Sequence, residues 1–227
     1  MTDVLVTAIL AAADAVDAAR QELGRLDGAA GDGDHGMTMS IGARNVRRRF
    51  QSLPPEASPA EQLGQVALAM GDVGGAIGPL YSAALTAMAT EVGSSTTATS
   101  HGVADLRRTV EVAESAIVDL GHAGPGDKSV IDALHPVVEA LRDAETGAGD
   151  LRAAIERAAE AAEAGAASTA DMIARVGRAS RLGERSRGLP DAGATSLAII
   201  VRAMVDSHLD QRRGPGEFTD HPRATGR

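Results

Sequence analysis

Apolar residues recur along most of the chain at intervals of three and four positions, which is the spacing of residues on one face of an α-helix. The clearest example is the segment that ends at Gly121. Its apolar face consists of Leu106, Val110, Ala113, Ile117 and Leu120. No segment shows the strict alternation of apolar and polar residues that a half-buried strand would have. The pattern therefore predicts an all-α protein.

Eight or so helices are expected, separated by loops in which glycine and aspartate are frequent. Their approximate ranges are 3–24, 37–50, 59–70, 79–91, 106–121, 130–145, 151–164, 168–180 and 197–209. One helix start is well defined, because Ser58, Pro59 and Glu61 follow the pattern of a capping box with proline at the first helical position. Asp150 is expected to cap the helix that follows it, and Pro136 is a candidate kink.

Four predicted loops share a high glycine content, which leaves their backbone N–H groups accessible. These loops are 27–36, 71–78, 121–129 and 183–194. If alternate helix ends meet at one rim of a helical bundle, the loops converge there. Helix N-termini bind phosphate through free N–H groups and through the helix dipole. Such a rim would provide a nucleotide site without a P-loop.

Composition limits the kind of core that the chain can build. Hydrophobic residues make up 44% of the 227 residues but aromatic residues only 1%, so the core must consist of aliphatic side chains and alanine. Alanine is the best helix former, and small side chains let helices approach closely. We expect one helical domain over residues 1–210, without an internal boundary, followed by a disordered tail at 211–227.

Several classes of protein are excluded by the same composition. The absence of cysteine removes disulfides and thiol chemistry, and the net charge of −9 argues against a nucleic-acid partner. No uncharged apolar run is long enough to span a membrane, and no signal peptide is visible at the N-terminus. We therefore expect a cytoplasmic protein with neither a membrane nor a nucleic-acid partner.

The strongest chemical signal is acidic: Asp27, Asp32 and Asp34 lie within eight positions, with glycines between and after them. Like charges held that close repel one another unless a cation lies among them. Carboxylate oxygens suit Mg²⁺, which usually completes its shell with water and nucleotide phosphates. An EF-hand is excluded, since Met37 and Ala43 occupy the positions of its glycine and glutamate. Two readings remain, a Mg–nucleotide site and an ordinary solvated turn.

Five sequence blocks extend this signal over nearly the whole chain up to residue 209. They are GDGDHG at 31–36, GGAIGPLY at 74–81, PGDKSVIDALHPVVE at 125–139, GRASRLGERSRG at 177–188 and DAGATS at 191–196. In this order they resemble the L subunit of dihydroxyacetone kinase, the nucleotide-binding component of that enzyme. The resemblance implies an eight-helix antiparallel barrel with the nucleotide at one rim. It also implies that Asp27, Asp32 and Asp34 coordinate a pair of Mg²⁺ ions that bridge the phosphates of ADP or ATP.

The resemblance further implies which residues contact the nucleotide. They are His35, Gly36, Met37, Thr38, Ala76, Ile77, Gly121, Val130, Arg178, Asp191, Ala192 and Gly193. For some of them a structural role is also open. His35 either hydrogen-bonds a phosphate or an aspartate, or it caps a helix or packs, and Asp191 can stabilise its turn or cap the last helix alongside a nucleotide contact. Lys128, the only lysine, is expected to pair with Asp127 or Asp132 and hold its turn, because Asp127 interrupts the P-loop pattern.

By the same resemblance, the chain would not bind the sugar itself. It would dock on a K subunit that holds dihydroxyacetone covalently through a histidine, and a homodimer is a further option. The phosphoryl donor would be either exchangeable ATP or a bound ADP that a phosphotransferase-system M subunit rephosphorylates. The expected function is therefore that of the ADP/ATP-binding subunit of a dihydroxyacetone (glycerone) kinase, or of a kinase for a similar short ketose.

The chain departs from the family pattern at three positions. Ile77 replaces a serine whose hydroxyl could hold a phosphate oxygen, Thr38 replaces an asparagine, and Ala192 replaces a proline. The expected metal ligands are intact, but loss of one hydrogen bond to a charged group costs about 1.5–3 kcal/mol. These departures leave a second function open, that of a non-catalytic regulatory partner whose phosphate site is degenerate.

Overall fold

The computed structural model describes residues 4–94, 102–147 and 150–213, and every regular element in these ranges is helical. The α-helices are α1 (Val4–Ala18), α2 (Arg20–Ala30), α3 (His35–Gln51), α4 (Pro59–Gly71), α5 (Ile77–Ser94), α6 (Val103–Gly121), α7 (Ile131–Thr146), α8 (Leu151–Ser168) and α9 (Ala192–Arg213). Two 3₁₀ segments, η1 (Thr169–Asp171) and η2 (Arg178–Ser186), lie between α8 and α9. The prediction of an all-α protein is confirmed.

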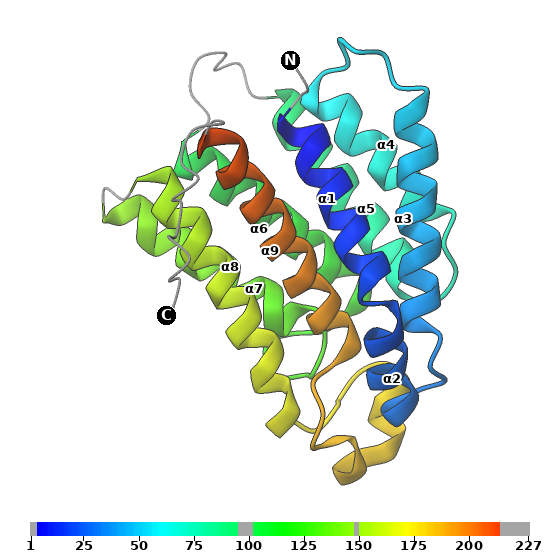
Figure 1. Cartoon of the computed structure of the whole chain (residues 1–227). Helices are drawn as coiled ribbons and strands as arrows, with labels where there is room; N and C mark the ends of the chain where they lie inside the picture. The colour runs from blue at the N-terminus through cyan, green and yellow to red at the C-terminus, as the bar shows by residue number, and fades with distance from the viewer. Residues whose placement is uncertain (1–3, 95–101, 148–149, 214–227) are drawn as a thin grey trace, which may run out of the picture.

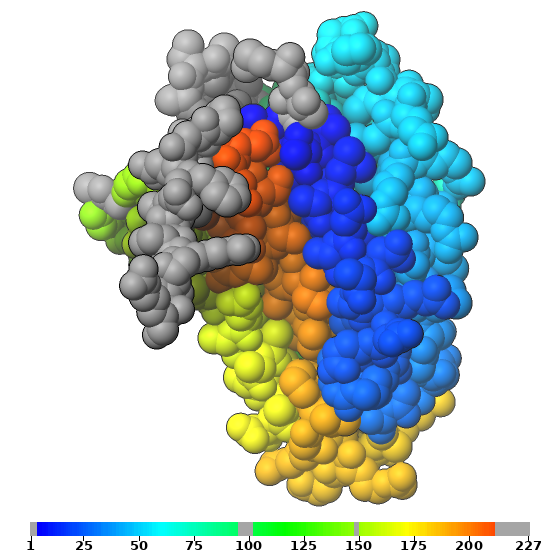
Figure 2. Space-filling view, viewed as in Figure 1, coloured from blue at the N-terminus to red at the C-terminus, as the bar shows by residue number. Residues whose placement is uncertain are grey.

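Eight of these helices form a closed ring. Helix α1 packs against α3, each helix from α3 to α8 contacts the next one along the chain, and α9 closes the ring against α1. Figure 1 shows α1 and α9 side by side and antiparallel in an elongated bundle. Because successive helices reverse direction, the N-terminal ends of α3, α5, α7 and α9 meet at one end of the ring. Figure 2 shows the η2 region closing this end beside α2, and the two segments are in contact.

The ring is filled by aliphatic side chains and alanine. Helix α8 buries five alanines, and it packs between α7 and α9. Its Gly165 lies so close to α7 that a Cβ there would be 2.3 Å from the backbone oxygen of Asp132. Small residues therefore set the helix spacing, as the composition predicted. None of the described helices is long and apolar enough to cross a membrane.

Most of the predicted helices form, and their caps can be compared with the structure. The capping box is present, since Glu61 N donates to Ser58 Oγ at 3.3 Å and Ser58 N donates to Glu61 Oε2 at 2.7 Å. Asp150 is the N-cap residue of α8, but its side chain makes no capping hydrogen bond. Helix α7 runs through Pro136 as a single element.

The prediction of one helix over 3–24 is wrong. The segment divides at Ala19 into α1 and α2, and α2 continues past Gly24 to Ala30. The glycine does not end the helix, and a Cβ on Gly24 would be in ordinary van der Waals contact, 3.5 Å from the backbone oxygen of Gly33. As a result, Asp27 lies in the last turn of a helix, whereas the sequence suggested a loop.

The helix predicted at 168–180 does not form either. Helix α8 extends to Ser168, and only short 3₁₀ turns follow it. Gly177 and Gly183 have φ angles of 66° and 54°, which lie outside the helical region and interrupt any longer helix here. The last helix begins at Ala192, earlier than predicted, and includes residues 211–213. The rest of the predicted tail, 214–227, lies outside the described residues.

Candidate functional site

A pocket of about 550 Å³ opens at the end of the ring where four helices begin. Its wall consists of residues at or just before the starts of α3, α5, α7 and α9, the last turns of α2 and α6, and parts of the η2 region. The first N–H groups of a helix have no partner within the helix, and the dipole adds about half a positive charge there. Four such ends around one pocket favour an anionic ligand.

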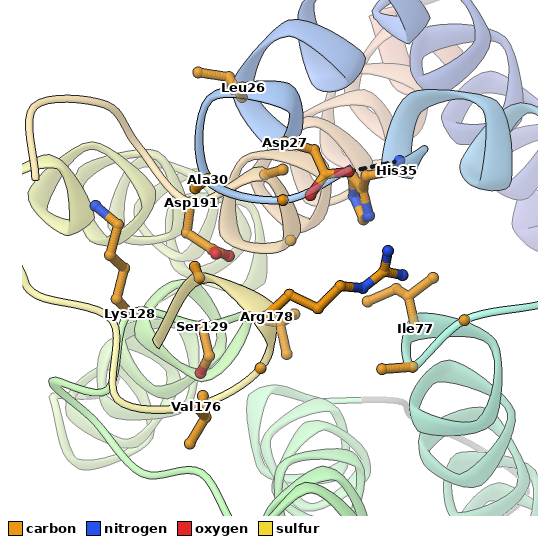
Figure 3. Close-up of a pocket in the computed structure, with 18 of the residues that line it drawn as sticks. Leu26, Asp27, Ala30, His35, Ile77, Lys128, Ser129, Val176, Arg178 and Asp191 are labelled. Carbon is orange, nitrogen blue, oxygen red and sulfur yellow. Dashed lines mark hydrogen bonds between the residues drawn. The ribbon is translucent and has the colours of Figure 1, made fainter. Parts of the chain in front are cut away.

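Three carboxylates lie together beside this pocket. Asp27 comes from the last turn of α2, Asp32 from the short loop, and Asp34 is the N-cap residue of α3. One oxygen from each lies within 4.8 Å of the others. The backbone N–H of His35 donates to Asp27 Oδ2 at 3.1 Å (Figure 3). Carboxylate oxygens at this separation suit a hard cation such as Mg²⁺.

The loop that carries Asp32 depends on its glycines. Gly33 has a φ of 76°, in the left-handed region that favours glycine. At Gly31, a Cβ would lie 2.5 Å from Asp27 Oδ1. Larger residues at these positions would displace the backbone or the carboxylate, so the glycine spacing read from the sequence has a direct geometric reason.

Arg178 approaches the carboxylates from another wall of the pocket. It is the first residue of η2, and Figure 3 shows its side chain extended across the pocket. Its guanidinium forms one ion pair with Asp32 and a second with Asp34, in which Nη2 and Oδ2 are 3.4 Å apart. Two of the three carboxylates therefore share one positive charge.

His35 lines the pocket, although only 9% of its surface is exposed. Its Nε2 lies 3.0 Å from Ser196 Oγ, and the Ser196 hydroxyl donates to the backbone oxygen of Gly193 at 2.9 Å. Burial lowers the pKa of His35, against the opposing effect of Asp27. Ser196 was missed by sequence reasoning, although it ends the DAGATS block.

Lys128 is buried in the wall of the pocket and joins separate segments of the chain (Figure 3). Its ammonium donates to the backbone oxygens of Thr169 at 2.6 Å and Leu189 at 2.8 Å. The expected pairing with Asp127 or Asp132 is wrong, because those carboxylates accept hydrogen bonds from backbone N–H groups of their own turn. Burial also lowers the pKa of Lys128. The lysine thus holds together three loops rather than one.

Asp191 combines a capping position with a place in the pocket wall (Figure 3). Its Oδ1 accepts a hydrogen bond from Ala194 N at 2.8 Å, which caps α9. Its own N–H donates to Thr169 Oγ1 at 2.8 Å, next to the carbonyl that binds Lys128. Burial raises the pKa of Asp191 to about 6. The capping role expected for this residue is present in the structure.

The rest of the wall is largely aliphatic. It includes Leu26, Ile77, Leu80, Leu120, Val130, Val176 and Leu189, and no phenylalanine, tyrosine or tryptophan is among the described lining residues. Apolar walls with a few polar groups are typical of small-molecule sites. A flat ring such as a nucleobase would here be held by aliphatic contacts. Tyr81 is buried in the core.

Folding brings together most of the residues that the sequence singled out. Those that line the pocket are Asp27, Asp34, His35, Thr38, Ala76, Ile77, Gly121, Val130, Arg178, Asp191, Ala192 and Gly193. Asp32 lies beside the pocket and forms an ion pair with Arg178, which lines the pocket. Lining residues such as Leu80, Ser129 and Val176 were not predicted, since nothing in their local sequence separates them from other residues of the same type.

Two of the predicted residues lie elsewhere. Gly36 faces α2, where a Cβ would be 2.0 Å from the backbone oxygen of Arg20. Met37 is 44% exposed and lines a separate surface hollow together with Arg20 and Gln21. Their predicted contact with a nucleotide stays a prediction, and Gly36 also has a packing role at the contact between α2 and α3.

This arrangement of fold and site agrees with the comparison with known protein families. Residues 29–206 match the family model described as the DAK2 domain. The match includes most of the ring and of the residues around the pocket. The chain therefore belongs to the DAK2 domain family.

Its relatives are named as kinases or kinase subunits. It is 39% identical over 201 residues to D-erythrulose kinase of Mycolicibacterium smegmatis, covering 86% of this chain and 34% of the relative. It is 34% identical over 196 residues to the ADP-binding subunit DhaL of PEP-dependent dihydroxyacetone kinase 2 of Listeria innocua, covering 85% of this chain and 88% of that subunit. The chain thus spans about a third of the erythrulose kinase but most of the subunit.

A solved structure shows the same fold. The dihydroxyacetone kinase from C. freundii, in complex with AMP-PNP and Mg²⁺, superposes with a TM-score of 0.67 and 25% sequence identity. The alignment covers 91% of this chain and 34% of that one. The eight-helix arrangement is therefore shared with a kinase structure that contains a nucleotide analogue and a metal.

Proposed function

We propose that this chain binds a Mg–nucleotide and forms the L-type component of a kinase for dihydroxyacetone or a similar short ketose. The observation that carries the proposal is the cluster of Asp27, Asp32 and Asp34 beside four helix N-termini. The metal needs oxygen ligands, and the phosphates need N–H donors and positive charge. Both requirements are met at one end of the ring.

In this function the aspartates serve as ligands of a pair of Mg²⁺ ions and not as bases. When bound, Mg²⁺ neutralises charge on the phosphoryl group and holds it in line for transfer. The start of α5 offers backbone N–H groups to the phosphates, and Arg178 adds a permanent positive charge. The aliphatic wall encloses the base and excludes water from it.

The sugar would be bound outside this chain, on a K subunit or an equivalent domain. The names of the relatives support a short ketose as substrate, since one is an erythrulose kinase and another an ADP-binding subunit of a dihydroxyacetone kinase. The donor would be ATP, or ADP that an M subunit of the phosphotransferase system rephosphorylates. A cytoplasmic location belongs to the same proposal.

One observation favours a second function. Ile77 lies in the first turn of α5 and lines the pocket, so an apolar side chain is present where phosphates are expected. If it prevents productive binding, the chain would be a regulatory partner of a kinase. Transfer would then fail while binding to the partner persisted.

The metal assignment can be tested with Asp34→Ala. Removing one of three oxygen ligands should abolish Mg-dependent ADP binding, measured by isothermal titration with and without Mg²⁺. Asp210→Ala removes an exposed carboxylate near the far end of α9 and should bind like the wild type. Unchanged Mg-dependent affinity in Asp34→Ala would refute the assignment.

A second measurement separates the donors and the rival function. The protein is purified with Mg²⁺, any bound nucleotide is released by heat and identified, and its exchange with labelled ATP is timed. Retained ADP that does not exchange supports rephosphorylation by a protein, and fast exchange supports free ATP. No nucleotide at any Mg²⁺ concentration would favour the regulatory function.

A further inference from the structure

The carboxylate cluster already contains a cation of the protein itself. The Arg178 guanidinium pairs with Asp32 and Asp34, whereas Asp27 receives the N–H of His35. Arg178 and Asp34 are 144 positions apart in the sequence. This ion-pair group therefore connects the η2 region with the loop between α2 and α3, across the opening of the pocket.

These pairs are suited to exchange rather than to permanent fixation. The side chains of Arg178, Asp32 and Asp34 are 49%, 50% and 53% exposed, and exposed ion pairs contribute only about 0–1 kcal/mol. A guanidinium is always charged and matches the planar carboxylate, so it reduces the repulsion among the three acidic groups. Its presence on these oxygens opposes a second cation at the same place.

We propose that Arg178 occupies the carboxylate cluster in the ligand-free protein and moves to the nucleotide phosphates when Mg²⁺ and nucleotide bind. This inference rests on the proposed function and adds a coupling between its two ligands. Mg²⁺ can bind fully only after Arg178 has left Asp32 and Asp34, and the released guanidinium is then free to pair with phosphate. Nucleotide and metal therefore strengthen each other's binding, and this coupling is reciprocal.

The geometry around Arg178 supports such a movement. Its side chain crosses a pocket that also contains the starts of α5 and α9. The residue follows Gly177 at the start of a short 3₁₀ segment, and both residues are exposed. Within the part of the chain that the structure describes, the ion pairs of the guanidinium are those with the half-exposed Asp32 and Asp34, so releasing it breaks no buried ion pair.

The test is Arg178→Gln, studied by isothermal titration with Mg²⁺ alone and then with ADP in the presence of Mg²⁺. Without the guanidinium, Mg²⁺ alone should bind about three- to tenfold more tightly, because no exposed ion pairs need to be broken. ADP should bind more weakly, because a phosphate partner is lost. Opposite changes for the two ligands distinguish this role from general structural damage, which would weaken both.

Arg181→Gln is the matched control. Arg181 lies in the same 3₁₀ segment and is exposed, and no carboxylate of the described residues lies within 4.0 Å of it. The substitution Arg181→Gln removes the same charge from the same region, so any general electrostatic effect on Mg²⁺ affinity appears in both variants. Arg178→Lys keeps the charge but loses the planar pair of N–H donors that matches a carboxylate. Its Mg²⁺ affinity should lie between those of the wild type and Arg178→Gln.

Two failures can be told apart. If the wild type shows Mg-dependent ADP binding but Arg178→Gln binds Mg²⁺ no more tightly than Arg181→Gln, this inference is wrong and the proposed function stands. If the wild type binds no ADP at any Mg²⁺ concentration, the proposed function fails and the inference fails with it. A gain in Mg²⁺ affinity together with a loss in ADP affinity, confined to Arg178→Gln, supports the inference.

Discussion

At the scale of single residues, Asp191 makes stability depend on pH. Burial raises the pKa of Asp191 to about 6 from an ordinary 3.8. Between these values the native protein holds a proton that the unfolded chain has released, so the free energy of unfolding falls as pH rises through this range. In Asp191→Asn the amide cannot ionise but still offers an oxygen to Ala194 N. The variant should therefore gain stability relative to the wild type from pH 4 to 7, by up to about 3 kcal/mol.

This expectation is checked by urea unfolding without nucleotide at several pH values. Asp210→Asn, which replaces an exposed carboxyl on the same helix, serves as the control. The difference between Asp191→Asn and the wild type should grow with pH and level off above the pKa of Asp191. A difference that stays constant over the whole range would show that the pKa of Asp191 is the same in the native and the unfolded protein, so that burial does not raise it.

At the scale of elements, the crossing of α2 and α3 determines where the carboxylates lie. A Cβ on Gly36 would be 2.0 Å from the backbone oxygen of Arg20 and 2.8 Å from the backbone nitrogen of Gly24. Because these neighbours are backbone atoms, no rotamer change relieves the clash. Gly36→Ala should destabilise the protein by about 1–3 kcal/mol in urea unfolding. It should also weaken Mg-dependent ADP binding, since α2 carries Asp27.

The matched variant is Gly64→Ala. Gly64 lies inside α4, and a Cβ there would meet no atom within 4 Å. Alanine is the better helix former, so this change should stabilise the protein by about 0.5–1 kcal/mol and leave ADP binding unchanged. Equal effects of the two substitutions would mean that glycine at the crossing reflects helix propensity alone and not close approach.

The helices and loops also show which structural features can be predicted from the sequence and which cannot. The helices and the capping box at Ser58 are local patterns, and they could be predicted. Gly24 was misread as a helix end because the packing of α2 on α3, which brings Gly36 against the backbone nitrogen of Gly24, is a tertiary contact. The partners of Lys128 could not be predicted for the same kind of reason: its ammonium binds two backbone oxygens, and every residue of the chain offers such a group.

At the scale of the whole molecule, the closed ring explains how one site draws on distant parts of the chain. Because successive helices alternate in direction, the starts of α3, α5, α7 and α9 meet at one end, and the connections at the other end lie a helix length away. A ligand in the pocket therefore contacts several segments of the chain at once. It does not contact the loops that connect the helices at the opposite end of the ring. Binding should stabilise these segments together, because a ligand that binds only the native state opposes their local opening.

Hydrogen exchange with and without Mg·ADP can check this. Amide exchange should slow at 31–38, 74–80, 126–131 and 176–193, four of the segments that line or adjoin the pocket, and should not change at 52–58, the connection from α3 to α4 at the opposite end. The region 176–193 should show the largest change, because its short 3₁₀ turns are the least regular part of the wall. Protection of one segment alone would indicate a local anion contact, and protection of 52–58 as well would indicate general tightening of the ring. Either result would contradict a nucleotide held by four converging helix starts.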